Sequence, residues 1–172
     1  EHLGHTGGAH LIGLVGMGAC ISQVMAIKRP DLVRSMMNMG AWSDATDPLF
    51  HEQIELFLDV HRGMGWEAFQ RFVCMMSFRP DFYNDNYKRL LGPDGPWREL
   101  NGRLGAHERF IHACLNHNVT AQLANVKCPS LIIHSHMDTV TSPRMTRPIQ
   151  AGVPNAEGLD LVDFAHVVAG KE

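Results

Sequence analysis

The chain is 172 residues long, the size of one domain, and its 15 Lys and Arg against 18 Asp and Glu give a formal net charge of −3. This balance excludes the basic excess with which proteins hold nucleic acid or an anionic membrane surface. Hydrophobic residues make up 45% and charged residues 19%, which suffices for a packed core and excludes a disordered tail. No apolar run approaches the roughly 18 residues that a membrane-spanning helix needs. The sequence therefore predicts a soluble globular protein with no nucleic-acid or membrane partner.

The cysteines are widely spaced along the chain, at Cys20, Cys74, Cys114 and Cys128. Without a Cys-x-x-Cys pair or a dense framework, neither a zinc site made of four thiolates nor a disulfide scaffold is expected. We predict four buried thiols in a reducing compartment, which indicates a cytoplasmic protein.

The first predicted element is the apolar run at residues 9–15, interpreted as a strand that is buried on both faces of a parallel sheet. A Gly16-Met17-Gly18 turn follows, and then a helix over residues 19–28 that Pro30 ends. Residues 32–39 form a second apolar segment. Strand, turn, helix and strand in this order are typical of a right-handed βαβ unit.

The pattern changes from Asp47 to about Asn118, where apolar residues recur at three- and four-residue spacing. This region predicts four or five short helices and no strands. A third strand at 128–134, a helix at 143–150 and a short strand at 158–162 follow. The sequence thus predicts an α/β fold with an open parallel sheet, divided into core residues 1–46 and 123–172 and a helical cap at 47–122.

Three loops follow the carboxyl ends of predicted strands, where ligands and catalytic groups gather in open parallel sheets. They hold, in chain order, the turn at Gly16, the acid Asp138 and the histidine His166. Residues 11–33 resemble the nucleophile-elbow strand and helix of the α/β hydrolases. Residues 129–138 resemble the strand that delivers the catalytic acid, and residues 163–167 resemble the histidine loop. On these residues the chain resembles the carboxyl-terminal two-thirds of the α/β-hydrolase superfamily, with a helical cap.

This resemblance implies a sheet of the α/β-hydrolase type, truncated at its amino-terminal side, and chemistry on a small ester, lactone or C–C bond without a cofactor. Asp138 takes the role of the acid and His166 that of the base. The backbone N–H of Met17 becomes an oxyanion donor at a helix amino terminus. Trp42 and His136 are candidate substrate-binding residues.

The sequence departs from the family at the nucleophile. The motif Gly-x-Ser-x-Gly falls on residues 14–18, so the serine position is Gly16, which has no side chain. Anchoring the motif on Gly13 moves that position to Val15, which is equally inert. Covalent catalysis needs an oxygen or sulfur nucleophile, and Cys20, one helical turn later, is expected to point away from the site.

Two hypotheses follow from this departure. In one, the Asp138–His166 pair acts as a base toward water or dioxygen, as in the cofactor-free oxygenases of this fold. In the other, the protein is a non-catalytic member of the family that binds a small molecule or takes part in an interaction. Ordinary serine turnover is not expected in either case.

Two other patterns point to different ligands. Residues 13–18 resemble a dinucleotide-binding loop, but Ile21 stands where that loop needs a small residue. His134-x-His136-x-Asp138 resembles a zinc-binding run, but Thr139 stands where the next histidine belongs. We therefore expect neither a cofactor nor a metal.

The early strands that would pair with residues 9–15 in this fold are not in the chain, which begins with Glu1 rather than Met. An open strand edge exposes unpaired backbone groups. We therefore expect either that the chain is a piece of a longer protein or that a partner covers the edge of the strand at 9–15.

Overall fold

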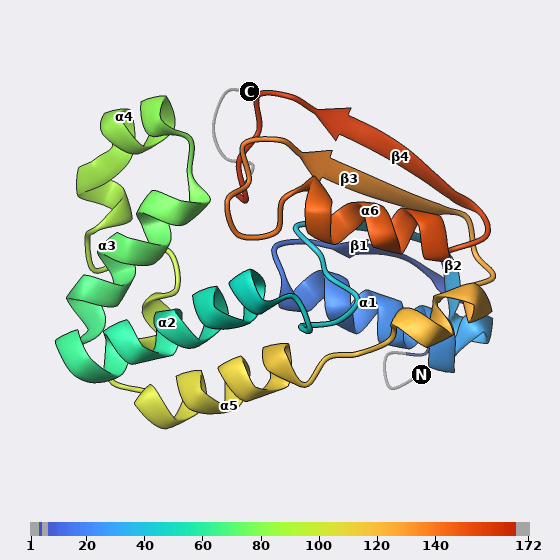
Figure 1. The fold of residues 1–172 in the computed structure, drawn as a ribbon, viewed down its shortest axis with the longest axis horizontal. Coiled ribbons are helices and arrows are strands. Elements are labelled where there is room, and N and C mark those ends of the chain that lie inside the picture. Colours follow the sequence, from blue (N-terminus) through green and yellow to red (C-terminus); the bar gives the residue numbers. More distant parts are fainter. Residues whose placement is uncertain (1–3, 5–6, 168–172) are drawn as a thin grey trace.

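The computed structural model describes residue 4 and residues 7–167. Its centre is one sheet of four parallel strands, in the spatial order β1 (Ala9–Gly13), β2 (Val33–Met39), β3 (Ser130–Ser135) and β4 (Ala156–Leu161) (Figure 1). Helix α1 (Met17–Lys28) and the 3-10 helix η1 (Pro30–Leu32) join β1 to β2, and α6 (Pro143–Gly152) joins β3 to β4. The predicted α/β class with a parallel sheet is confirmed, and β2, β3 and β4 begin and end within two residues of their predicted bounds.

The helices that connect the strands cover one face of the sheet. A single apolar cluster joins Ala26 of α1, Leu123 of the 3-10 helix η3 (Thr120–Asn125) and Ile149 of α6 to Met36 and Ile132 of the strands. Each strand is added on the same side of the one before it, so right-handed crossovers place every connection on the same face. In Figure 1, α1 and α6 accordingly both lie in front of the strands.

The prediction that residues 9–15 form a strand buried on both faces is wrong. Strand β1 ends at Gly13, pairs only with β2 among the described residues and lies at the edge of the sheet. Ile12 points away from the helices and is 67% exposed, and Leu14 is 47% exposed. An apolar run does not distinguish a central strand from an edge strand with one covered face. That another segment covers this edge stays a prediction.

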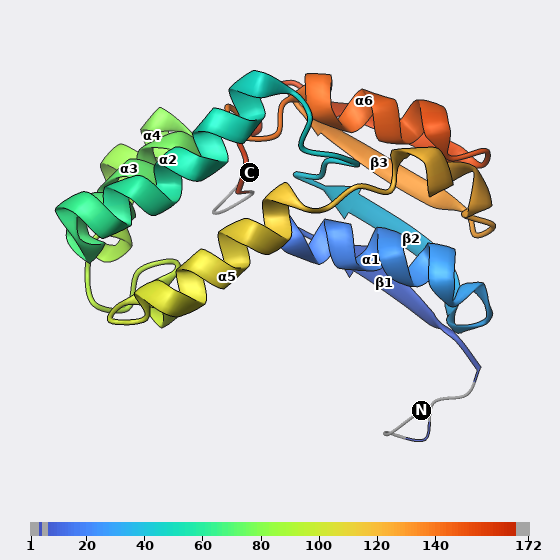
Figure 2. The ribbon, with the colours of Figure 1, turned by 60° about the horizontal axis from the view of Figure 1, so that its bottom comes forward.

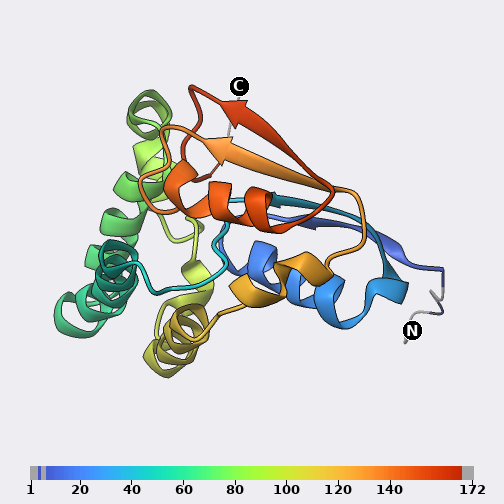
Figure 3. The ribbon, with the colours of Figure 1, turned by 45° about the vertical axis from the view of Figure 1, so that its right-hand side comes forward.

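Between β2 and β3 the chain forms a block of helices, here called the helical block: α2 (Pro48–Met64), α3 (Trp66–Ser77), α4 (Pro80–Leu90), the 3-10 helix η2 (Arg98–Leu100) and α5 (Leu104–Leu115). Figures 2 and 3 show this block beyond the carboxyl ends of the strands. Its apolar cluster includes Trp42 and Cys20 from the sheet side, so the block packs directly on the strand ends. None of the helices in the described ranges is long and apolar enough to span a bilayer.

Local sequence signals set the bounds of α2. The Asp47 side chain caps the helix by accepting a hydrogen bond of 2.8 Å from the N–H of Phe50, and Pro48 takes the first helical position, where no N–H is needed. The helix ends at Gly65, whose φ of 85° lies in the region that glycine tolerates. Asp47 also forms an ion pair with Arg144 of α6, and this ion pair links the start of the helical block to a helix that packs on the sheet.

Candidate active site

The turn between β1 and α1 is sharp and is held by the end of β2. The N–H of Val15 donates to the Met39 carbonyl at 3.1 Å, and the N–H of Gly16 donates to the Gly40 carbonyl at 2.7 Å. Val15 has a φ of 48°, which is strained for a β-branched residue, and Gly16 has a φ of 73°. The two hydrogen bonds therefore keep the backbone in an unfavourable conformation that brings the amino terminus of α1 to the cavity described below.

Asp138 and His166 form a buried hydrogen-bonded pair. His166 Nδ1 lies 2.9 Å from Asp138 Oδ2 and 3.0 Å from the hydroxyl of Thr141, which itself donates to Oδ2 at 2.8 Å. The other carboxylate oxygen, Oδ1, accepts the backbone N–H groups of Val140 and Thr141, each at 2.7 Å. Both oxygens of the Asp138 carboxylate therefore accept two hydrogen bonds each, and these bonds fix the carboxylate in place.

The electrostatics favour an ionised Asp138 beside the imidazole. Burial alone raises the pKa of Asp138, which is 3% exposed, but the attraction to His166 in its protonated form and the hydrogen bonds from His166 and Thr141 outweigh the effect of burial. The pKa of this carboxyl therefore lies below its ordinary value of 3.8. An ionised acceptor at Nδ1 keeps the proton on that nitrogen, so the lone pair of His166 resides on Nε2 and is available to a base mechanism.

Two residues that support the pair were missed in the sequence. Gly40 has a φ of 63°, and a Cβ there would lie 3.1 Å from His166 Cε1 and 3.3 Å from Nδ1. A side chain at residue 40 would therefore crowd the ring, which would have to shift by a few tenths of an ångström. Thr141 carries a weak signal, since a hydroxyl residue three positions after an aspartate commonly closes a hydrogen-bonded turn. For Gly40, the only indication in the sequence is a glycine directly after a predicted strand, a pattern that is not specific to a site.

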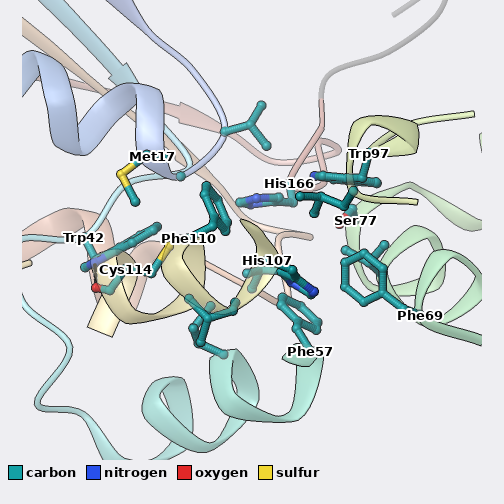
Figure 4. Close-up of a pocket in the computed structure, with 17 residues that line it drawn as sticks. Met17, Trp42, Phe57, Phe69, Ser77, Trp97, His107, Phe110, Cys114 and His166 are labelled. Atoms are coloured by element: carbon teal, nitrogen blue, oxygen red, sulfur yellow. Dashed lines mark hydrogen bonds between the residues drawn. The ribbon is translucent and has the colours of Figure 1, made fainter. Parts of the chain in front are cut away.

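His166 lies on the wall of a cavity of about 70 Å³ between the sheet and the helical block (Figure 4). Gly16 and Met17 line it from the turn before α1, and aromatic side chains such as Phe57 and Phe69 line it from the helices. Met17 is the first residue of α1, so its N–H has no acceptor within the helix. The cavity thus brings together the imidazole of His166, a helix amino terminus and mostly apolar walls.

The structure places the two predicted substrate-binding residues differently. Trp42 lines the cavity and is 2% exposed, and its Nε1 donates to the Cys114 carbonyl at 3.3 Å. His136 does not line the cavity: its Nε2 lies 2.6 Å from Asp160 Oδ1 on β4. The backbone N–H of His136 continues the β3–β4 pairing by donating to the Leu161 carbonyl at 3.0 Å. That His136 contacts substrate stays a prediction, and its position outside this cavity does not support it.

The other candidate ligands and nucleophiles are engaged in packing. Both ring nitrogens of His134 have partners on α6, Thr146 Oγ1 at 2.6 Å and Gln150 Oε1 at 2.7 Å. Cys20 is 1% exposed and does not line the cavity, and burial raises the pKa of its thiol strongly. Across the described ranges, no three His, Cys, Asp or Glu side chains are grouped so that they would hold a metal ion.

A second pair of histidines joins α2 to α5 at the far side of the cavity. His61 and His107 lie with their Nδ1 atoms 2.9 Å apart, and His107, 1% exposed, lines the cavity. Burial and then the neighbouring His61 lower the pKa of His107 from 6.5 to about 4, and burial also lowers the pKa of His61. Both rings are therefore neutral at pH 7, with one Nδ1 donating to the other.

We expect the free energy of unfolding to fall between pH 7 and pH 5 because of His107. The unfolded chain takes up a proton near the ordinary pKa of 6.5, whereas the folded protein does so only near 4. Stability from this group is thus present above pH 6.5 and is lost as the pH falls toward 4, by about 1–2 kcal/mol at pH 5. Urea unfolding at the two pH values measures it.

His107→Gln keeps a donor for His61 and removes this titration, so its stability changes less between the two pH values. His112→Gln is the matched control, because His112 is exposed on the same helix. An equal pH dependence of the wild type and His107→Gln would contradict the assignment.

A scan of the sequence against models of known protein families finds no match. The protein named "Putative carbamate hydrolase RutD" from Rhizobium rhizogenes is 23% identical over 154 residues, which make up 88% of this chain and 58% of that protein. The crystal structure of MGS-M2, an α/β-hydrolase enzyme from a Medee basin deep-sea metagenome library, has a TM-score of 0.82 and 26% identity, over 96% of this chain and 60% of its own. The enol-lactonase from Burkholderia xenovorans has a TM-score of 0.78 and 18% identity, over 94% and 59%.

The chain therefore spans less than two-thirds of the length of each of these proteins. The structural matches to MGS-M2 and to the enol-lactonase extend over 96% and 94% of this chain. The resemblance inferred from the three loops is confirmed: the chain has the α/β-hydrolase fold, and the proteins it resembles are hydrolases.

Proposed function

We propose that this chain carries a site for the hydrolysis of a small carbonyl compound, an ester, lactone or carbamate, in which His166 acts as a general base on water. The observation that carries the proposal is the buried Asp138–His166 pair at 2.9 Å, with His166 on the wall of an apolar cavity. The names of the similar proteins, a carbamate hydrolase and an enol-lactonase, agree with this substrate class.

In the proposed reaction, His166 Nε2 takes a proton from water as the water oxygen attacks the carbonyl carbon. Asp138 holds the other ring nitrogen and stabilises the imidazolium that forms. The N–H of Met17, at the positive end of α1, donates to the developing oxyanion. When the tetrahedral intermediate collapses, the proton passes from Nε2 to the leaving group, and the base is regenerated.

We place Gly16 at the position where hydrolases of this fold carry their nucleophile. Gly16 caps α1, has a φ of 73° and lines the same cavity as His166. Because glycine offers no attacking atom, the proposal has water attack directly, without an acyl-enzyme. Residues 47–122 are assigned to a cap that encloses the substrate, since they supply the far wall of the cavity.

A second candidate function is the binding of a small molecule without turnover. The observation that favours it is Gly16 itself, since the cavity is formed but has no nucleophile at that turn. The two candidates share the ligand class and differ only in whether the Asp138–His166 pair is used.

The test compares p-nitrophenyl acetate and an enol-lactone as substrates of the wild type, His166→Ala and Gly16→Ser. We expect slow turnover by the wild type and a loss of about 100-fold or more in His166→Ala, the usual contribution of a general base. Wild-type protein that binds but never turns over either substrate, with turnover appearing only in Gly16→Ser, would establish the second candidate.

Gly16→Ser is expected to fold with reduced stability. A Cβ at residue 16 would lie 3.1 Å and 3.3 Å from two ring atoms of Trp42, and the backbone there has a positive φ. The strain costs about 1–3 kcal/mol, which thermal unfolding measures. Labelling of the wild type by a fluorophosphonate probe would show that the nucleophile lies elsewhere.

A further inference from the structure

The hydroxyl of Ser77 is buried on the cavity wall without a hydrogen-bond partner. Ser77 is the last residue of α3, is 0% exposed and lines the same cavity as His166 (Figure 4). Among the described residues, two other buried side-chain oxygens lack a partner, on Asn38 and Ser135, and neither residue lines this cavity. Unpaired buried polar groups cost stability, so each one calls for a reason.

The last turn of α3 is fastened to both loops that carry the buried pair. The Met76 carbonyl accepts from the Thr139 hydroxyl at 2.8 Å, and the Ser77 carbonyl accepts from the Val167 N–H at 2.9 Å. Thr139 directly follows Asp138, and Val167 directly follows His166. The position of Ser77 relative to the buried pair is thus set by hydrogen bonds and not by packing alone.

The Ser77 proton has no acceptor among the described residues. A serine at a helix end commonly donates to a carbonyl of the preceding turn, but its Oγ makes no such bond here. The walls around it, such as Val73 and Trp97, are apolar. A ligand oxygen that enters the cavity therefore finds a donor in Ser77, whereas an apolar ligand leaves the hydroxyl unpaired.

We propose that Ser77 is a substrate-binding residue that donates a hydrogen bond from Oγ to an acceptor oxygen of the ligand. Ser77 thereby selects small carbonyl compounds over hydrocarbons of the same shape. The inference rests on the proposed function for the site, but it concerns binding and is tested without turnover.

The experiment measures the dissociation constants of cyclohexanone and of methylenecyclohexane, which replaces the carbonyl oxygen with a CH₂ group. Fluorescence of Trp42 and Trp97, which line the cavity, reports the binding. Ser77→Ala is expected to weaken cyclohexanone binding by about 3- to 10-fold, the range for one neutral hydrogen bond, and to leave methylenecyclohexane binding unchanged. Ser135→Ala removes a buried unpaired hydroxyl outside the cavity and is expected to change neither constant.

Thermal unfolding provides a second measurement. Both Ser→Ala variants are expected to unfold at or above the wild-type temperature without ligand, because each loses an unpaired buried hydroxyl, and only Ser77→Ala loses part of the stabilisation by cyclohexanone. Equal weakening of both ligands in Ser77→Ala, no weakening, or no cyclohexanone binding by the wild type each overturns the inference. If Ser77→Ala binds cyclohexanone normally while His166→Ala abolishes ester turnover, this inference fails and the proposed function stands.

Discussion

Asp138→Asn is expected to lower ester turnover by about 100- to 10,000-fold and the free energy of unfolding by about 2–3 kcal/mol. Asparagine still offers an oxygen to the backbone N–H groups of Val140 and Thr141, so the loop is retained. Its NH₂ group, however, replaces Oδ2 and faces the Thr141 hydroxyl and His166 Nδ1. The imidazole then no longer keeps its proton on Nδ1, and the base is lost.

The expected loss of 2–3 kcal/mol in the free energy of unfolding is about the contribution of hydrogen bonds to a charged group. Initial rates with p-nitrophenyl acetate and urea unfolding at pH 7 measure the two effects.

Asp138→Ala is the companion variant, because it also leaves both loop N–H groups without an acceptor. The free energy of unfolding of Asp138→Ala is expected to fall by about 3–5 kcal/mol, more than that of Asp138→Asn.

The pH dependence of stability provides a separate check. Because the folded pKa of Asp138 lies below 3.8, the carboxylate stabilises the protein above that pH and loses this effect as the pH falls further. Both variants should lack this part of the acid destabilisation. Asp138→Asn with wild-type turnover would contradict the role of the pair.

Gly40→Ala is expected to lower turnover by about 10-fold, because the new methyl group shifts the His166 ring by a fraction of an ångström and a full ångström costs about 100-fold. The new methyl group would lie 3.1 Å from His166 Cε1, and the left-handed backbone at residue 40 is unfavourable to alanine. Strain and crowding together lower the free energy of unfolding by about 2–4 kcal/mol. Steady-state kinetics and thermal unfolding measure both quantities.

The matched control for Gly40→Ala is Gly102→Ala. Gly102 has a similar φ of 69°, but nothing lies within 4 Å of its added Cβ. Gly102→Ala therefore introduces backbone strain without crowding. Its free energy of unfolding is expected to fall by about 1–2 kcal/mol, and its turnover is expected to be unchanged. Equal kinetic effects of the two variants would show that Gly40 does not position His166.

The sequence predicted the strands, the helical block and three loops at one edge of the sheet, because each of these depends on local patterns. The apolar run at 128–134 predicts β3 by itself, and Pro30 ends a helix wherever the helix lies. The order of Gly16, Asp138 and His166 then placed them together, since parallel strands end at one edge. The same local patterns could not show that Ile12 lies on an uncovered face, which depends on where the other helices pack.

By itself, then, the sequence determined the fold class, since periodicity and strand ends are properties of short segments, and its resemblance to the α/β hydrolases pointed to Asp138 and His166. Only the tertiary structure decided which residues support and surround that pair. Gly40 and His166 are 126 residues apart in the chain, and Ser77 reaches the cavity from a helix of another segment. Such contacts depend on how segments that are distant in the chain pack against one another. The missing side chain of Gly40 and the unpaired hydroxyl of Ser77 therefore gain their roles only in the packed structure.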